Sequence, residues 1–123
     1  MNDYQTLPGL AEVYLEDSFV LGIHEGRDSL SFDLDAVLTE QHPRYTPPPD
    51  EQYCYVNATL SFTRTTVIDW ISRTDASYRD ANDEIDQGNI DFLTVDDDTY
   101  RLGGDWGEVA IQSSTPPEFR IEE

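Results

Sequence analysis

Histidine and cysteine, which commonly serve as bases, nucleophiles or metal ligands, are few in this sequence of 123 residues, and they are far apart in it. His24 and His42 lack the HxH or HExxH spacing of a zinc site. A thiolate–histidine pair would need the single cysteine, Cys54, beside one of them. Cys54 stands in an alternating apolar run, so we expect it to be a small core residue. The sequence therefore predicts no catalytic, metal or cofactor site, and an enzyme would need a site without a recognisable motif.

Two groups of carboxylates could bind a cation or act as an acid–base pair. Asp96, Asp97 and Asp98 offer oxygen ligands, but the glycine and glutamate of an EF-hand loop are missing at their required positions. Asp33 and Asp35 are two residues apart, a spacing compatible with the carboxylate pair of a glycosidase. Nothing in the sequence indicates a sugar cleft. We therefore expect both groups to be solvated surface charges.

The most distinctive local string is GGDWG, residues 103–107. Its glycines permit a tight turn, whereas the lysine and the spacing of a phosphate-binding loop are absent. Trp106 is then either a cap over the core, which we prefer, or an exposed aromatic for binding.

The charge composition indicates which classes of partner the chain can attract. The chain has 26 acidic residues and seven arginines but no lysine, which gives a formal net charge of −19. No basic patch is available to neutralise phosphates, so we expect neither nucleic acid nor an anionic membrane to be a partner. A basic protein surface would be attracted. Acid excess without lysine is also typical of proteins from salt-rich cells or GC-rich genomes, and this compositional explanation competes with a specific partner.

Most of these residues are predicted to lie on β-strands or in the turns between them. Phe19–Leu38 is typical of a β-hairpin with a type II′ turn centred on Gly26 and Arg27. Apolar matching then predicts the pairs Ile23–Leu30, Leu21–Phe32, Phe19–Leu34 and Leu15–Leu38, with a bulge at 16–18. Asp33 and Asp35 would lie on the opposite, wet face.

The remaining chain alternates in the same manner. Residues 53–62 are predicted to form a strand with Cys54, Val56, Ala58, Leu60 and Phe62 on its apolar face. Residues 65–71 fit a helix or a strand, and their β-branched side chains favour the strand. A meander over 90–112 would pair Val95 and Ile111 with Tyr100, and Leu93 and Val109 with Leu102. Phe119 and Ile121 would add an edge strand.

These patterns predict one all-β domain over 1–123: an antiparallel meander of about six to eight strands, forming a sandwich or an open barrel, with at most one short helix. Residues 1–9 and 113–123 are expected to be partly flexible ends, and 72–88 an acidic mobile loop. Because the sequence shows no signal peptide, no transmembrane run and no second cysteine for a disulfide, we expect a cytoplasmic location.

Three strings carry a resemblance to known proteins. LPGL (7–10), YLEDSFVL (14–21) and YRLGGDWGEVAI (100–111) resemble strings of small uncharacterised bacterial β-rich proteins. The last string is also similar to the closing hairpin of immunity proteins of polymorphic toxin systems. The resemblance assigns no functional residue and implies a binding role.

We therefore expect an acidic protein-binding module, of which an immunity-type protein that neutralises a basic partner is one case. The alternatives are a small-ligand or cation-binding β-barrel protein, or an enzyme. The predicted interaction surface comprises two carboxylates and three aromatic side chains: Asp33, Asp35, Tyr53, Tyr55 and Trp106.

Overall fold

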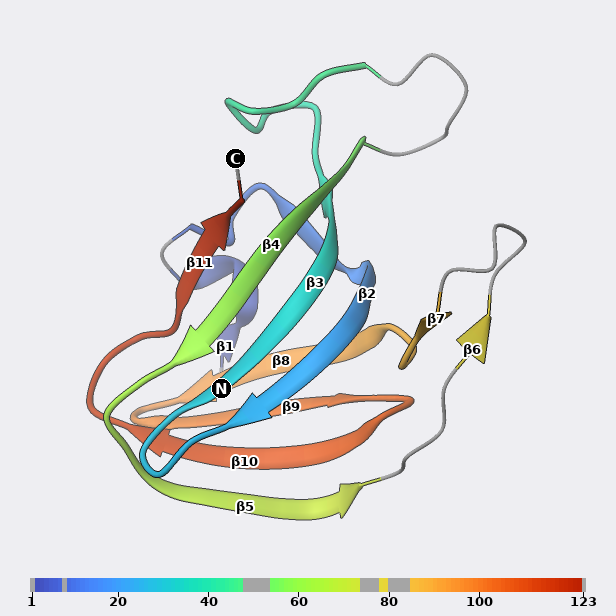
Figure 1. The fold of residues 1–123 in the computed structure, drawn as a ribbon. Helices are drawn as coiled ribbons and strands as arrows, with labels where there is room; N and C mark the ends of the chain where they lie inside the picture. Colours follow the sequence, from blue (N-terminus) through green and yellow to red (C-terminus); the bar gives the residue numbers. More distant parts are fainter. Residues whose placement is uncertain (1, 8, 48–53, 74–77, 80–84, 123) are drawn as a thin grey trace.

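Two antiparallel β-sheets face each other in the computed structural model of the chain (Figure 1). The structure describes residues 2–7, 9–47, 54–73, 78–79 and 85–122. Within these residues the helical content is one 3-10 turn, η1 (Tyr4–Thr6), and eight strands have four residues or more. The prediction of an all-β fold is confirmed, and the two sheets form a sandwich, not a closed barrel.

The four-stranded sheet has the order β11-β4-β3-β2. Its strands are β2 (Val13–Glu25), β3 (Leu30–Leu38), β4 (Cys54–Phe62) and β11 (Glu118–Ile121). The alternating face predicted for β4 is confirmed, since Ala58, Leu60 and Phe62 belong to the core while Ser61 and Thr59 face the other way. The predicted edge strand at Phe119 and Ile121 is β11, paired with β4.

The second sheet has the order β1-β8-β9-β10-β5. Its strands are β1 (Asn2–Asp3), β5 (Thr65–Arg73), β8 (Ile90–Asp96), β9 (Thr99–Gly104) and β10 (Gly107–Ser113). The ambiguous segment 65–71 is a strand, as its β-branched residues favour. The predicted meander register is confirmed at all four pairs, those of Val95 and Ile111 with Tyr100 and those of Leu93 and Val109 with Leu102.

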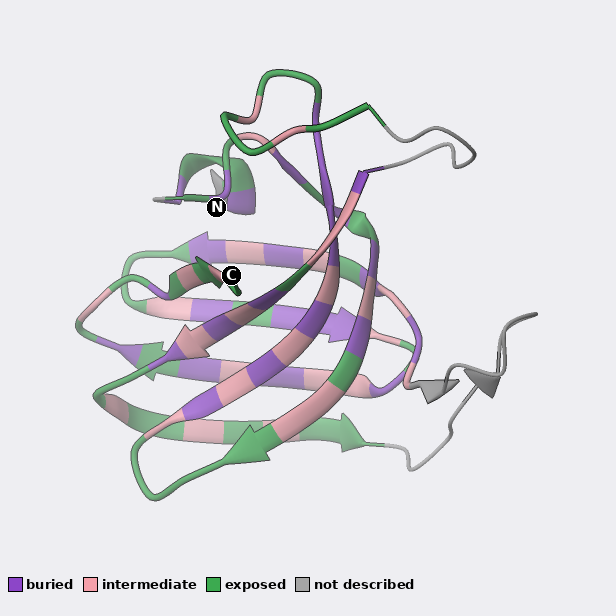
Figure 2. Cartoon of the chain, turned by 45° about the horizontal axis from the view of Figure 1, so that its top comes forward, coloured by how far each residue is buried: buried purple, intermediate pink, exposed green. Residues whose placement is uncertain are grey.

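Between the sheets lies one apolar core to which every long strand contributes. Buried residues alternate with more exposed ones along the strands of both sheets, as a period of two requires (Figure 2). At its centre Phe32 packs on Phe62 and on Trp106, with ring centroids 6.4 and 5.2 Å apart. Tyr100 contacts Phe62 from the opposite sheet at 5.5 Å. Aromatic pairs in these orientations stabilise a core beyond their buried area.

The predicted register of the β2–β3 hairpin is wrong. Ile23 pairs with Phe32 and Glu25 with Leu30, so the central turn residues are Arg27 and Asp28. Neither Gly26 nor Arg27 is at positive φ, hence the turn is not type II′. Leu21 does not lie opposite Phe32; it is an extra residue in a bulge between Val20 and Gly22, and 40% of its surface is exposed.

This bulge at Leu21 reverses the faces of Phe19 and Val20, the two residues that directly precede it. Val20 enters the core opposite Leu34, whereas Phe19 pairs with Asp35 on the outer side. An inserted residue changes the facing of every later side chain because strand side chains alternate. The predicted inward position of Phe19 is therefore incorrect for a physical reason that the apolar pattern alone does not contain.

A second bulge confirms the irregularity predicted at 16–18. Between Tyr14, which pairs with Val37, and Phe19, which pairs with Asp35, strand β2 has more residues than β3. The buried Ser18 hydroxyl accepts the Val37 N–H at 2.9 Å and donates to the Tyr14 carbonyl at 2.7 Å. This side chain supplies the hydrogen bonds that the interrupted ladder lacks. Val13 consequently takes the place opposite Leu38 that was predicted for Leu15.

Both chain ends, predicted to be partly flexible, contain paired strands: β1 lies on β8 and β11 on β4. The fully buried Tyr4 follows β1, and its hydroxyl accepts the Leu15 N–H at 3.2 Å. Burial, and after it the hydrogen bond to Glu16, raises the pKa of Tyr4 above its usual range. The predicted acidic loop 72–88 lies partly outside the described residues; β6 (Tyr78–Arg79) and β7 (Ile85–Asp86) pair with each other within it.

Candidate functional site

The face of the four-stranded sheet that points away from the core carries aromatic and acidic side chains together. It includes every second residue of β3, with neighbours from β2 and β4 in register on each side. We call it the acidic–aromatic face and define it by Tyr14, Phe19, His24, Asp33, Asp35 and Tyr55. Alternation places these side chains outside because Leu34, Ala36 and Leu38 between them are buried inside.

Its aromatic part consists of two neighbouring rows across the sheet. One row is Tyr14–Val37–Tyr55, and the next contains Phe19 opposite Asp35. The rings of Phe19 and Tyr55 bridge β3 and stack with centroids 6.4 Å apart. Val37 is fully buried although it does not belong to the core between the sheets. The rings that flank Val37 therefore form a small apolar layer on the outside of the sheet.

The acidic part begins directly beside these rings. Asp35 is half-buried and shares its row with Phe19, and Asp33 occupies the same face two residues earlier. His24 Nε2 lies 2.7 Å from Asp33 Oδ2. The two side chains meet beside Gly22, where an added Cβ would be 3.4 Å from both of these atoms. The carboxylates of β3, an interior strand of the sheet, thus lie next to the apolar layer.

Described arginines form ion pairs with glutamates, and Arg120 lies on the outer side of the four-stranded sheet, in the row that contains Thr59 and Asp33. The pairs are Arg101 with Glu108, Arg120 with Glu118 and Arg73 with Glu25. Exposed pairs of this kind stabilise a fold by about 1 kcal/mol at most. The acidic–aromatic face thus carries the carboxylates of Asp33 and Asp35, with His24 beside Asp33 and Arg120 on the edge strand of the same sheet.

Three of the five predicted interaction residues come together. Asp33, Asp35 and Tyr55 share the acidic–aromatic face, and Tyr53 lies outside the described residues. Trp106 does not belong to a surface: it is 0% exposed and packs on Phe32 and Trp70. The turn at Asp105–Trp106 folds the indole ring inward over the core, so Trp106 cannot belong to the predicted interaction surface and is the core cap that we prefer.

Sequence reasoning missed Phe19 and Tyr14 as members of the face. Their outward position depends on the two bulges of β2, which interrupt alternation on both sides of Phe19. Gly22 is the available signal, since glycine inside a strand often marks a bulge. The adjacent apolar residues Phe19 and Val20 also show that one of them must face outward.

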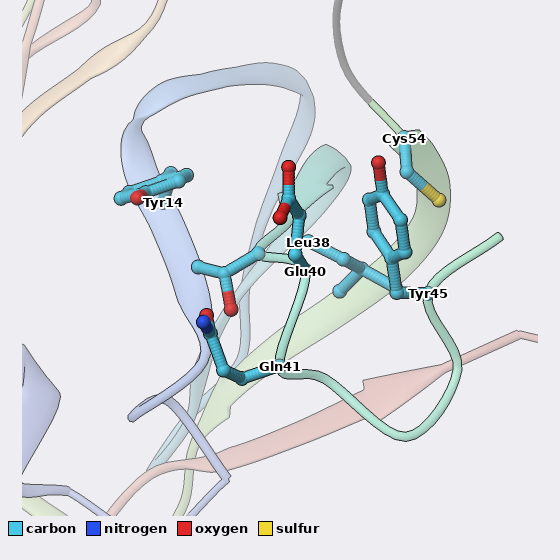
Figure 3. A pocket seen from close by; sticks show the side chains of 7 residues that line it. Tyr14, Leu38, Glu40, Gln41, Tyr45 and Cys54 are labelled. Carbon is cyan, nitrogen blue, oxygen red and sulfur yellow. The ribbon is translucent and has the colours of Figure 1, made fainter. Parts of the chain in front are cut away.

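A pocket of about 390 Å³ opens at the end of the same sheet, where β3 leaves for β4 (Figure 3). Its labelled lining residues are Tyr14, Leu38, Glu40, Gln41, Tyr45 and Cys54. Cys54 is a free thiol, 8% exposed, and belongs to the core as predicted. Tyr14 lines this pocket and also ends a row of the acidic–aromatic face, so the two features adjoin.

The described residues contain no group of three or more His, Cys, Asp or Glu side chains arranged to hold a metal ion. Asp97 and Asp98 form the turn between β8 and β9, and both are exposed. His24 lies on the outer face, while His42 lies in the loop after β3. Among the described residues, no helix has the length and apolarity needed to cross a membrane.

Comparison of the chain with protein-family models, with curated proteins and with solved structures found no match.

Proposed function

We propose that this protein binds another protein whose contact surface is basic, and that the acidic–aromatic face makes the contact. The observation that carries this proposal is the Phe19–Tyr55 stack beside Asp35 on the outside of a sheet. A stack of this kind is not needed to cover the core, which the second sheet already covers. Rigid aromatic anchors next to charges are typical of the residues that dominate binding energy at protein interfaces.

Charge supports the same partner class. With a net charge of −19, the chain as a whole attracts cationic surfaces, but this attraction alone does not define a site. Asp33 and Asp35 add a local feature, because carboxylates beside apolar rings lie where an approaching surface would exclude water. Complementary charge there mainly accelerates association and selects the orientation of binding.

An immunity-type protein that neutralises a basic toxin is the concrete form of this proposal. It rests on the resemblance of residues 100–111 to the closing hairpin of such proteins and on the acidic–aromatic face. We propose that it acts in the cytoplasm, consistent with a single, free cysteine. The small-ligand alternative has its own support in the pocket at the end of the four-stranded sheet.

The experiment is affinity capture from an extract of the source cell with three immobilised proteins. These are the wild type, the face variant Asp33→Asn/Asp35→Asn and a control, Asp69→Asn/Asp91→Asn. The control removes two exposed carboxylates from the second sheet and so matches the change in charge. We expect the wild type and the control to retain the same basic protein, and the face variant to lose most of it.

Capture of no basic protein by the wild type would contradict the proposal. Equal capture by the face variant would place the contact elsewhere on the molecule. Equal loss in the face variant and the control would mean that overall charge, and not this face, determines binding.

A further inference from the structure

The pocket at the end of the four-stranded sheet combines three kinds of surface. Leu38 and Cys54 supply apolar surface, since a buried thiol behaves as a small apolar group. Tyr14 and Tyr45 stand on opposite sides, and Glu40 projects between them (Figure 3). The pocket therefore offers aliphatic contact, aromatic rings and one carboxylate within about 390 Å³.

Charges around the pocket are mainly negative. Thr39 lines the pocket, and its hydroxyl donates to the Glu12 carboxylate at 3.0 Å, which adds a second acid to this region. Arg44 lies in the same loop and contributes a positive charge. His42 accepts the Arg44 N–H at its Nδ1, 3.0 Å away, and burial followed by the charge of Arg44 lowers the pKa of His42. A lowered pKa favours the uncharged form of His42, so this ring adds little positive charge beside the pocket.

The volume and the position of the pocket limit its occupant. About 390 Å³ is at the small end of ligand sites, where one long side chain or a small molecule fits. Tyr14 connects the pocket with the row that contains Val37 and Tyr55. A protein seated on the acidic–aromatic face would thus reach the pocket without leaving the sheet.

We infer that this pocket receives an arginine side chain of the basic partner, an inference that rests on the proposed function. The methylene stem would contact Leu38 and Cys54, and the guanidinium would lie between the tyrosine rings with Glu40 as its carboxylate. Arginine suits these groups better than lysine because its planar guanidinium stacks on rings and binds a carboxylate through two N–H groups. Cation–π attraction to the tyrosines adds to the ion pair.

The test uses N-acetyl-arginine amide as a probe, titrated into the full-length protein while backbone amide shifts are followed by NMR. We expect saturable changes at Leu38–Gln41 and Cys54. The lysine analogue should bind more weakly, and the citrulline analogue, which is neutral and nearly isosteric, should not bind. Glu40→Gln should weaken the arginine probe by roughly tenfold, the effect of losing a charged hydrogen-bond partner. The control Asp91→Asn, on the second sheet, should leave its affinity unchanged.

Shift changes spread over the molecule without a maximum at the pocket would overturn the inference, and so would equal binding of the lysine analogue. Failure of this inference can be separated from failure of the proposed function with the captured partner itself. If Glu40→Gln binds that partner as the wild type does, while Asp33→Asn/Asp35→Asn does not, the arginine pocket is refuted and the acidic–aromatic face is retained.

Discussion

On each face of the four-stranded sheet two aromatic rings contact each other, but the two pairs have opposite surroundings. On the inner face, Phe32 and Phe62 are fully buried against the second sheet. On the outer face, Phe19 and Tyr55 stack over β3 and remain half-exposed. The inner pair lies among leucines and a tryptophan, whereas the outer pair lies beside two aspartates.

Burial between the sheets distinguishes the aromatic residues that stabilise the fold from those on the outer face. Apolar rings between the sheets lower the free energy of the folded state by leaving water. Rings on the outer face gain only part of this stabilisation, and the charges beside them keep that side of the sheet wet. A partner surface would complete their burial, which is why the outer pair is the candidate for binding and the inner pair is not.

The greatest loss of stability is expected from a substitution on the inner face. Phe32→Ala should reduce the free energy of unfolding by about 3–5 kcal/mol, because it leaves a cavity beneath Trp106 and Phe62. Phe19→Ala on the outer face should cost only about 1 kcal/mol, since that ring is half-buried. Denaturant unfolding of both variants measures the difference. Equal losses, or a loss below about 1 kcal/mol for Phe32→Ala, would erase the contrast between the two faces.

The next effect concerns the bulge that shapes the outer face. Ser18→Ala should cost about 1–3 kcal/mol, because the buried Val37 N–H loses its acceptor. The control Ser61→Ala, on the half-exposed outer side of β4, should change stability by less than about 0.5 kcal/mol. Denaturant unfolding again supplies the values. A loss in Ser18→Ala no greater than in the control would show that the hydroxyl does not support the bulge.

Sequence patterns predicted the fold where alternation is continuous. In β8, β9 and β10 the turns are short and each apolar residue has one matching partner, so the register around Tyr100 and Leu102 was predictable. The β2–β3 hairpin differs because several registers match apolar residues equally well. The turn at Arg27–Asp28 and the bulge at Leu21 then decide the pairing, and neither follows from counting apolar residues.

The candidate site was predictable to the same degree. Asp33, Asp35 and Tyr55 lie on strands with regular alternation, so their common face could be inferred from the sequence. Phe19 could not, because its facing depends on the bulge in β2. Trp106 illustrates the reverse case, in which a side chain from a turn folds back into the core. The pocket at Glu40 and Tyr45 depends on the path of a loop, for which local patterns give no register.

Removal of an aromatic ring from the outer face should change stability only slightly but weaken binding measurably. Tyr55→Ala should change the free energy of unfolding by no more than about 1 kcal/mol, because the ring is half-exposed. Its affinity for the captured basic partner should fall by at least about tenfold, as expected for an aromatic anchor. Isothermal titration of wild type and variant measures the affinity. Unchanged affinity would remove Tyr55 from the interface.

The smallest expected effect lies in the loop beside the pocket. Burial, and then Arg44, lowers the pKa of His42, so the unfolded chain takes up a proton at higher pH than the folded protein does. The contribution of His42 to stability is therefore present above about pH 6.5 and is lost as the pH falls below it. His42→Asn should reduce the loss of unfolding free energy between about pH 7.5 and 5.5. A stability difference between wild type and variant that stays constant over this range would contradict the lowered pKa.

Association rates decide whether the carboxylates of the acidic–aromatic face guide a basic partner. Stopped-flow or surface-based kinetics would compare wild type, Asp33→Asn/Asp35→Asn and Asp69→Asn/Asp91→Asn across ionic strength. Screening limits exposed charges to about 8 Å at 0.15 M salt, so only carboxylates near the contact retain influence there. We predict that the wild-type rate falls steeply with salt, that the face variant associates more slowly with a shallower dependence, and that the control follows the wild type. An association rate that ignores salt, or a face variant indistinguishable from the control, would contradict the claim.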